Sequence, residues 1–177
     1  MKSFSAFGLW KLGEWVHRDG FKVVISGEGA DELFGGYIRY IQPHFNWLAQ
    51  KKFPSYKTMF KPAQSVDDSG WIEFCGNLRE LLRMGDRMSS AWGLENRCPF
   101  LDKRIIQFAF SLENQWKIDG LETKVILREI LRKRVPEYKD MEKTGLFCSV
   151  NKWIGSKEGF GKKDWLKVQY ETLGNKK

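Results

Sequence analysis

The stretch SGEGADELFGGY, between residues 26 and 37, places three carboxylates in a glycine-rich turn. Glu28 lies between Gly27 and Gly29, and Asp31 and Glu32 follow. Glycine accepts positive φ and lets the backbone approach a ligand closely. Residues three apart on a helical turn are neighbours, so Glu28 and Asp31 can converge at its mouth. Such carboxylates can bind a divalent cation beside phosphates or take a proton from an incoming nucleophile.

The same turn also has a purely structural interpretation. A helix dipole stabilises negative side chains at the helix start, so acids after a glycine turn can simply cap a helix. That interpretation accounts for Asp31 and Glu32. It leaves Glu28, which stands in front of the helix, unexplained.

The turn must be positioned by a strand before it and a short helix after it. Residues 22–25, KVVI, are a β-branched run that predicts a buried strand of the parallel type. Ala30 to Phe34 can form about one helical turn, which Gly35 and Gly36 end. Open α/β sheets bind ligands at such junctions. The chain shows no second convincing strand, so the other strands of this sheet are expected to be missing.

The remaining periodic segments predict helices. These are expected over 4–18, about 71–82, 103–112 and 122–135. The residues expected to begin or end them are Asp19–Gly20, then Asp67, Asp68 or Ser69, then Asp102, and finally Pro136. Residues 51–66 are predicted to form a loop, and the last dozen residues are predicted to form a frayed helix. The tryptophans at Trp10, Trp71, Trp92 and Trp153 are expected in the core.

Length and charge narrow the possible functions. The chain has 177 residues and a formal net charge of +8, which predicts one basic domain able to bury a real core. Nucleic acid, anionic lipid and phosphorylated ligands are the partners that such a charge suggests. The acidic turn lies in residues 1–36, where acids outnumber bases by five to four. The basic excess elsewhere forms no long block, which favours a solvated surface and argues against nucleic acid, even for the lysine-rich stretch 157–167.

Cysteine usage and hydropathy bear on the compartment. Cys75, Cys98 and Cys148 are widely separated and form no Cys-x-x-Cys pair. This argues against a disulfide framework or structural zinc and fits a reducing cytoplasm. No stretch reaches transmembrane length, and the first residues make a poor signal peptide.

Four motifs in order resemble the synthetase domain of glutamine-hydrolysing asparagine synthases. They are SGEGADELFGGY, RMGDRMSSAWGLENRCPFLDKRI at 83–105, GLETKVILREIL at 120–131, and KTGLF at 143–147. An ordered set is far more specific than one short motif. The resemblance implies the rear part of an α/β ATP pyrophosphatase (PP-loop, adenine nucleotide alpha hydrolase-like) domain over residues 1–177. It would be mainly α-helical, with one core strand near 22–25.

The resemblance also implies a reaction and roles for five residues. The family uses ATP and Mg²⁺ to adenylate the aspartate side chain, and ammonia from glutamine then forms asparagine, AMP and pyrophosphate. Ser26 and Gly27 would contact the AMP portion, and Glu28 would be the base that helps ammonia attack. Asp31 would hold Mg²⁺ against pyrophosphate, and Lys143 would stabilise charge on the leaving phosphates.

The chain departs from the family in what it lacks. The upstream Ser-Gly-Gly-x-Asp-Ser phosphate loop and the glutaminase domain are absent, so the chain alone is expected to be inactive. The missing N-terminal half would be supplied by a longer or a separate chain, and a homodimer is a further expectation. Two alternatives stay open: an asparagine synthase-like amidotransferase with another acceptor, and a non-catalytic binding module that kept only the helical layer.

Four charged residues outside the turn have both structural and functional interpretations. Glu95 and Arg97 are expected to form a buried ion pair that orders the loop before the proline, with substrate contact as the alternative. Lys124 and Arg128 lie four apart and predict a solvated helix face, with a phosphate-facing role as the minority option. Cys98 stands where the family usually has an aliphatic residue.

Overall fold

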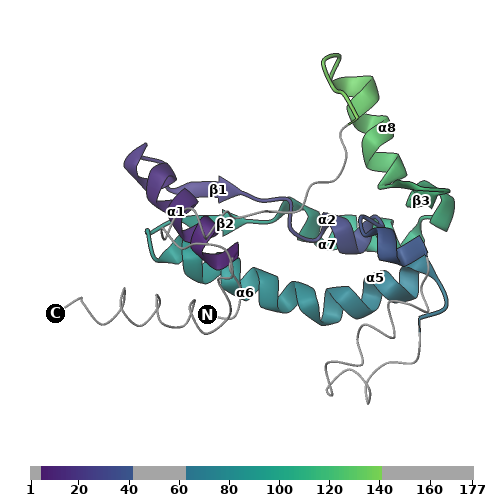
Figure 1. The fold of residues 1–177 in the computed structure, drawn as a ribbon, viewed down its shortest axis with the longest axis horizontal. Helices are drawn as coiled ribbons and strands as arrows, with labels where there is room; N and C mark the ends of the chain where they lie inside the picture. The colour runs from purple at the N-terminus through teal and green to yellow at the C-terminus, as the bar shows by residue number, and fades with distance from the viewer. Residues whose placement is uncertain (1–4, 42–62, 141–177) are drawn as a thin grey trace, which may run out of the picture.

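The computed structural model describes residues 5–41 and 63–140, which fold mainly into helices beside two small sheets (Figure 1). The mainly helical character expected from the sequence is confirmed. In chain order the elements are α1 (Ser5–Arg18), β1 (Val23–Ile25), α2 (Ala30–Leu33), η1 (Ile38–Ile41), α5 (Val66–Cys75), α6 (Asn77–Ser90), β2 (Glu95–Arg97), η2 (Pro99–Leu101), α7 (Lys103–Ser111), η3 (Asn114–Trp116), β3 (Ile118–Asp119), β4 (Glu122–Thr123) and α8 (Val125–Arg134).

The expectation of a strand without a partner is wrong. β1 pairs in parallel with β2, with Val23 opposite Glu95 and Ile25 opposite Arg97. β2 has the sequence ENR, which lacks the β-branched and aromatic residues that mark a strand, so the sequence pattern hides it. A second, antiparallel pair joins β3 to β4 through a turn at Gly120, whose φ is 55°.

The prediction that the strand is buried is also wrong. The side chains of Val23 and Ile25 point to the same face because they are two residues apart. Val23 is 39% exposed and Ile25 is 76% exposed, and Phe21 just before the strand is 61% exposed. The strand therefore presents an apolar face that the described residues do not cover.

The hydrophobic core is built around α2. Leu33 and Phe34 are almost fully buried with Ala109 of α7. The ring of Phe34 meets that of Phe100 edge to face, with centroids 5.9 Å apart. Partly buried side chains from α5, α7 and α8 surround this cluster. The core therefore holds the acidic turn in place through Leu33 and Phe34, which follow its carboxylates in the chain.

α1 packs along α6, at the left of Figure 1. The predicted helix over 4–18 is confirmed and ends at the predicted Asp19–Gly20. Trp10 and Trp92 are partly buried, and their rings contact each other at a tilt of 48° with centroids 5.1 Å apart. Trp71 is 48% exposed, so its expected place in the core is wrong. Trp153 lies outside the described residues.

The helix expected near 71–82 is two helices, α5 and α6, which meet at Gly76. Its predicted start is corrected as well. Ser65 is the N-cap: its hydroxyl accepts a hydrogen bond from the Asp68 backbone, and the Asp68 carboxylate accepts one from the Ser65 backbone. This reciprocal capping box leaves Asp67 and Asp68 inside the first turn.

The two later helices agree with the sequence except at one end. Asp102 caps α7 as predicted, since its carboxylate accepts a hydrogen bond from the Arg104 backbone at 2.9 Å. α8 begins at Val125 rather than at 122, because residues 122–123 form β4. α8 ends just before Pro136, as predicted. Residues 51–62 of the predicted loop and the predicted C-terminal helix lie outside the described residues.

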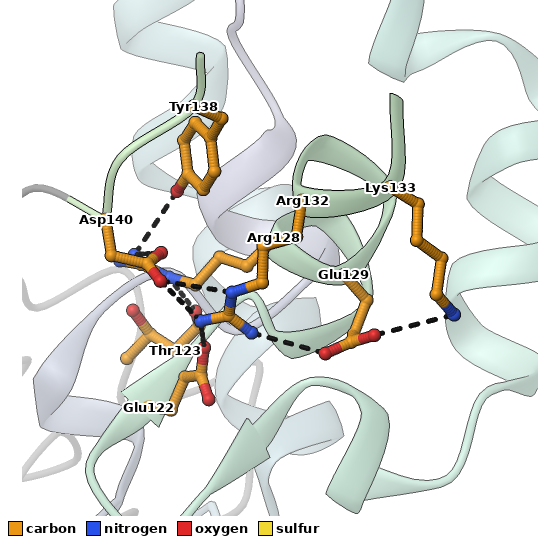
Figure 2. A network of polar contacts seen from close by, with 8 residues as sticks. All are labelled: Glu122, Thr123, Arg128, Glu129, Arg132, Lys133, Tyr138 and Asp140. Atoms are coloured by element: carbon orange, nitrogen blue, oxygen red, sulfur yellow. Dashed lines mark hydrogen bonds and ion pairs between the residues drawn. The ribbon is translucent and has the colours of Figure 1, made fainter. Parts of the chain in front are cut away.

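α8 projects away from the other helices (Figure 1) and is tied to its surroundings by arginines (Figure 2). Arg132 pairs with Glu122 of β4 at 2.6 Å and with Asp140 at 2.7 Å. Arg128 donates to the Thr123 carbonyl and to Asp140, each at 2.9 Å. These bonds span the junction between β4 and α8. In residues 5–41 and 63–140 no helix has both the length and the hydropathy that crossing a bilayer requires.

Candidate functional site

The candidate site lies where the two parallel strands end. Ser26 directly follows β1, and its backbone N–H donates to the Arg97 carbonyl of β2 at 2.9 Å. Its hydroxyl lies 3.3 Å from the sulfur of Cys98, which directly follows β2. The carboxyl ends of parallel strands are where open α/β sheets bind ligands. The structure therefore places Ser26 and Gly27 at the edge that the sequence predicted.

One glycine of the turn, Gly29, is required by its geometry. Gly29 has φ +90°, and a Cβ there would lie 2.4 Å from a methyl carbon of Leu101. The carbonyl of Gly27 accepts a hydrogen bond from Ala30, and α2 follows as a single helical turn, as predicted. The backbone thus turns sharply from the strand end into the core.

Glu28 is a half-buried carboxylate at this turn. Burial raises the pKa of Glu28 above its ordinary value, and the neighbouring charge of Asp31 raises it further. The influence of Asp31 on the pKa of Glu28 is in keeping with the predicted proximity of the two carboxylates. A carboxylate whose pKa is raised toward neutrality is better suited to accept and release a proton.

Asp31 forms an ion pair that the sequence did not indicate. Its Oδ1 lies 2.9 Å from the Nζ of Lys124, and each side chain is about a quarter exposed, at 27% and 28%. A Cβ on Gly36 would lie 1.8 Å from Asp31 Oδ1 and 2.3 Å from Lys124 Cε. Lys124 and Arg128 do not act as one solvated face, because Arg128 turns instead to Thr123 and Asp140.

Lys124 reaches Asp31 from an unusual backbone conformation. Its φ of 56° and ψ of 39° are left-handed, and it is the one non-glycine residue with positive φ in the part of the chain that the structure describes. That conformation costs an L-residue about 1–2 kcal/mol. Strain of this kind persists where the surrounding structure fixes it, commonly at functional sites. The sequence offered Lys124 a phosphate-facing role only as an alternative, and no local pattern predicts its ion pair with Asp31.

The third acid of the turn has a structural role. Glu32 is 3% exposed and accepts a hydrogen bond from the Tyr37 hydroxyl at 2.9 Å. Burial raises the pKa of Glu32 above its ordinary value. Glu73, also buried, pairs nearby with Arg39 at 3.0 Å. The turn therefore divides its acids between the candidate site, with Glu28 and Asp31, and the interior, with Glu32.

The oxygen donors at the site fit a partial Mg²⁺ site. Mg²⁺ prefers carboxylate oxygens, waters and phosphate oxygens, and one or two protein carboxylates commonly suffice. Asp31, the residue to which the metal is assigned, would supply one of them. Within the described residues no cluster of three or more His, Cys, Asp or Glu side chains could hold a metal ion. The remaining ligands would therefore come from a bound phosphate group and water.

Three further residues singled out from the sequence remain. Lys143 lies outside the described residues. Glu95 and Arg97 do form an ion pair, at 2.9 Å, but both side chains are more than 60% exposed, so the expected burial is wrong. In the strand pairing Glu95 lies beside Val23 and Arg97 beside Ile25. The described residues leave this face of both strands uncovered.

Comparison with known proteins identifies the family. A sequence model of the family named asparagine synthase matches residues 2–74 and 77–158. The chain therefore belongs to the asparagine synthase family. It is 33% identical over 129 residues to a glutamine-hydrolysing asparagine synthetase of Sandersonia aurantiaca. The aligned stretch covers 71% of this chain and 21% of the relative.

Other relatives give the same result. Glutamine-hydrolysing asparagine synthetase 3 of Arabidopsis thaliana is 31% identical over 136 residues, or 75% of this chain and 20% of the relative. The putative asparagine synthetase 1 of Methanocaldococcus jannaschii is 29% identical over 124 residues, or 70% of this chain and 20% of the relative. The chain thus matches about a fifth of the length of these curated relatives.

Proposed function

We propose that the chain is part of a glutamine-hydrolysing asparagine synthase, a carbon–nitrogen ligase that uses ATP and Mg²⁺. The observation that carries the proposal is the position of the acidic turn, which holds Glu28 and Asp31 and follows Ser26 where β1 and β2 end. The family membership supports the same reaction.

In the proposed reaction the aspartate side-chain carboxylate attacks the α-phosphorus of ATP, forming aspartyl-AMP and releasing pyrophosphate. Ammonia from glutamine then attacks the acyl carbon, and asparagine and AMP result. Ser26 and Gly27 would contact the AMP portion. Glu28 would accept the proton that the attacking ammonia loses, a role that its raised pKa suits.

Asp31 and Lys143 would act on the leaving group. Bound Mg²⁺ would supply positive charge against pyrophosphate. Asp31 would provide a carboxylate oxygen to hold the metal, and Lys143 would place a further positive charge there. This division separates the adenylation step from the amide-forming step, which makes the roles separable by experiment.

A second part of the proposal concerns a partner. The phosphate loop and glutaminase activity would be supplied by an N-terminal portion, in the same protein or a separate chain. The exposed apolar face of β1 supports this, since parallel strands are normally covered on both faces. Cys75 and Cys98 are free thiols, which is consistent with the proposed cytoplasmic location. In the absence of its partner the same face would favour homodimers.

The test uses the chain together with a complementing N-terminal fragment. ATP–pyrophosphate exchange and asparagine formation are measured side by side for each variant. Glu28→Gln keeps size and hydrogen bonding but cannot take a proton. It should retain exchange and lose about a hundred- to ten-thousand-fold in amide formation. Asp31→Asn and Lys143→Ala should both lose exchange itself.

The matched control is Glu80→Gln, an equal change at a carboxylate that is 71% exposed on α6, and it should leave both rates unchanged. Loss of exchange in Glu28→Gln would make Glu28 a metal or structural carboxylate. If no variant mattered, or if another acceptor were amidated faster than aspartate, the proposal of an asparagine-forming site would be wrong. The chain alone should release no pyrophosphate above the level of the Asp31→Asn variant, which is expected to lose adenylation.

A further inference from the structure

The ion pair between Asp31 and Lys124 is a feature that the proposed reaction leaves unused. It joins the acidic turn to the residue just before α8, at 2.9 Å. Both side chains are about three-quarters buried. Solvent and salt therefore screen their attraction less than they would screen an ion pair on the surface. The pair occupies an oxygen of the carboxylate to which the metal is assigned.

The backbone around Lys124 holds its side chain in this direction. On one side Thr123 accepts a hydrogen bond from Arg128, and Glu122 pairs with Arg132 (Figure 2). On the other side the Lys124 carbonyl accepts the hydrogen bond from the Arg128 backbone that opens α8, at 3.0 Å. These contacts fix the left-handed conformation of Lys124 from both directions.

The turn is shaped to receive the pair. Gly36 lies against the ion pair, and any side chain there would overlap both Asp31 Oδ1 and Lys124 Cε. The absence of a Cβ on Gly36 is therefore a requirement of the contact. Three separate positions, at 31, 36 and 124, combine to build one ion pair.

We propose that Lys124 occupies Asp31 in the metal-free chain and must be displaced before a divalent cation binds there. An ammonium and a divalent cation compete for the same carboxylate oxygen, and they repel each other at short range. Until the cation arrives, the ammonium compensates the charge of Asp31 beside Glu28. Lys124 is thus a positioning residue that sets the metal affinity of the site. The inference rests on the proposed function, because that function assigns the metal to Asp31.

The test is a titration of the full chain with Mn²⁺, a paramagnetic substitute for Mg²⁺. The readout is line broadening of the backbone amides from Asp31 to Gly36 in ¹H–¹⁵N spectra. Lys124→Met removes the ammonium and keeps most of the side chain. Lys124→Gly removes it with a residue that accepts positive φ, so it keeps the backbone even if the first variant misfolds. Both should lower the apparent Kd for Mn²⁺ about three- to tenfold.

Two controls make the outcome decisive. Lys133→Met makes the same change at a lysine of α8 that is 75% exposed, and it should leave the Kd unchanged. Asp31→Asn should abolish the broadening. If Asp31→Asn abolishes it but the Lys124 variants bind Mn²⁺ no more tightly than the unaltered chain, the competition is wrong and the metal assignment stands. If neither the unaltered chain nor the Lys124 variants show broadening at Asp31, the metal assignment and this inference both fail.

Discussion

β1 and the acidic turn are consecutive in the chain, yet they are buried in opposite ways. The strand carries apolar side chains, and Ile25 is 76% exposed. The turn carries carboxylates and glycines, and Ala30 and Glu32 are at most 5% exposed. Residue type alone would assign these environments the other way round.

The difference teaches which contacts each region depends on. The turn is fixed by residues of this chain, including Leu101, Gly70 and Lys124. The strand has one pairing partner among the described residues, and the face that carries Val23 and Ile25 is left uncovered. The site geometry is therefore local to this chain, whereas completion of the sheet is proposed to need another segment.

The largest expected loss of stability comes from a substitution at the contact between Gly70 and the backbone of Glu32. A Cβ at Gly70 would lie 2.5 Å from the Glu32 carbonyl oxygen, which is backbone and cannot rotate away. In an exposed helix Gly→Ala would stabilise, but here Gly70→Ala should cost about 1–3 kcal/mol in unfolding free energy. Urea unfolding measures it. Gly27→Ala, where a Cβ meets nothing within 4 Å, is the control, and equal losses in both would contradict the packing argument.

A smaller effect on the unfolding free energy is expected at Glu28, and its size depends on pH. Because the folded pKa is raised, a protonated Glu28 stabilises the fold below about pH 4.5, and this is lost as pH rises through the folded pKa. Glu28→Gln resembles the protonated form at every pH. It should therefore be more stable than the unaltered chain at pH 7, with the difference shrinking toward pH 4. Urea midpoints at both values test this, and a difference independent of pH would refute it.

The smallest effect is expected on the strand. Ile25→Thr keeps a β-branched residue and removes apolar surface from a side chain that is already exposed. The unfolding free energy should change by no more than about 0.5 kcal/mol. Self-association, followed by light scattering over a range of concentrations, should fall. A concentration-independent monomer before the substitution would show that the face of β1 needs no cover.

The parts of the fold that were predictable are those encoded locally. The helix over 4–18 and the cap at Asp102 follow from apolar spacing and capping chemistry within a few residues. The proximity of Glu28 and Asp31 is expected from their separation by three, and the effect of Asp31 on the pKa of Glu28 is in keeping with it. In the helix near 71–82, three acceptable cap residues in succession concealed Ser65, because nothing local shows which residue leaves the helical conformation first.

The parts that were missed depend on distant contacts. β2 is a strand because β1 lies beside it, and its three polar residues carry no strand preference of their own. Lys124 was considered only as a possible phosphate-facing residue, and its ion pair with Asp31 was missed because it depends on β4 and α8 holding Lys124 in a conformation that lysine rarely adopts. Both are decided by tertiary packing, which local propensity cannot encode.

The contact between Gly29 and Leu101 also limits how these motifs can change over evolutionary time. A larger residue at 29 meets two separate obstacles, the side chain of Leu101 and a φ of +90°. A lineage that replaced Leu101 with a smaller residue would remove the first obstacle only. A substitution at Leu101 alone therefore cannot make a larger residue acceptable at position 29. Gly29 has almost no freedom to vary, even though its neighbour Leu101 belongs to a different motif.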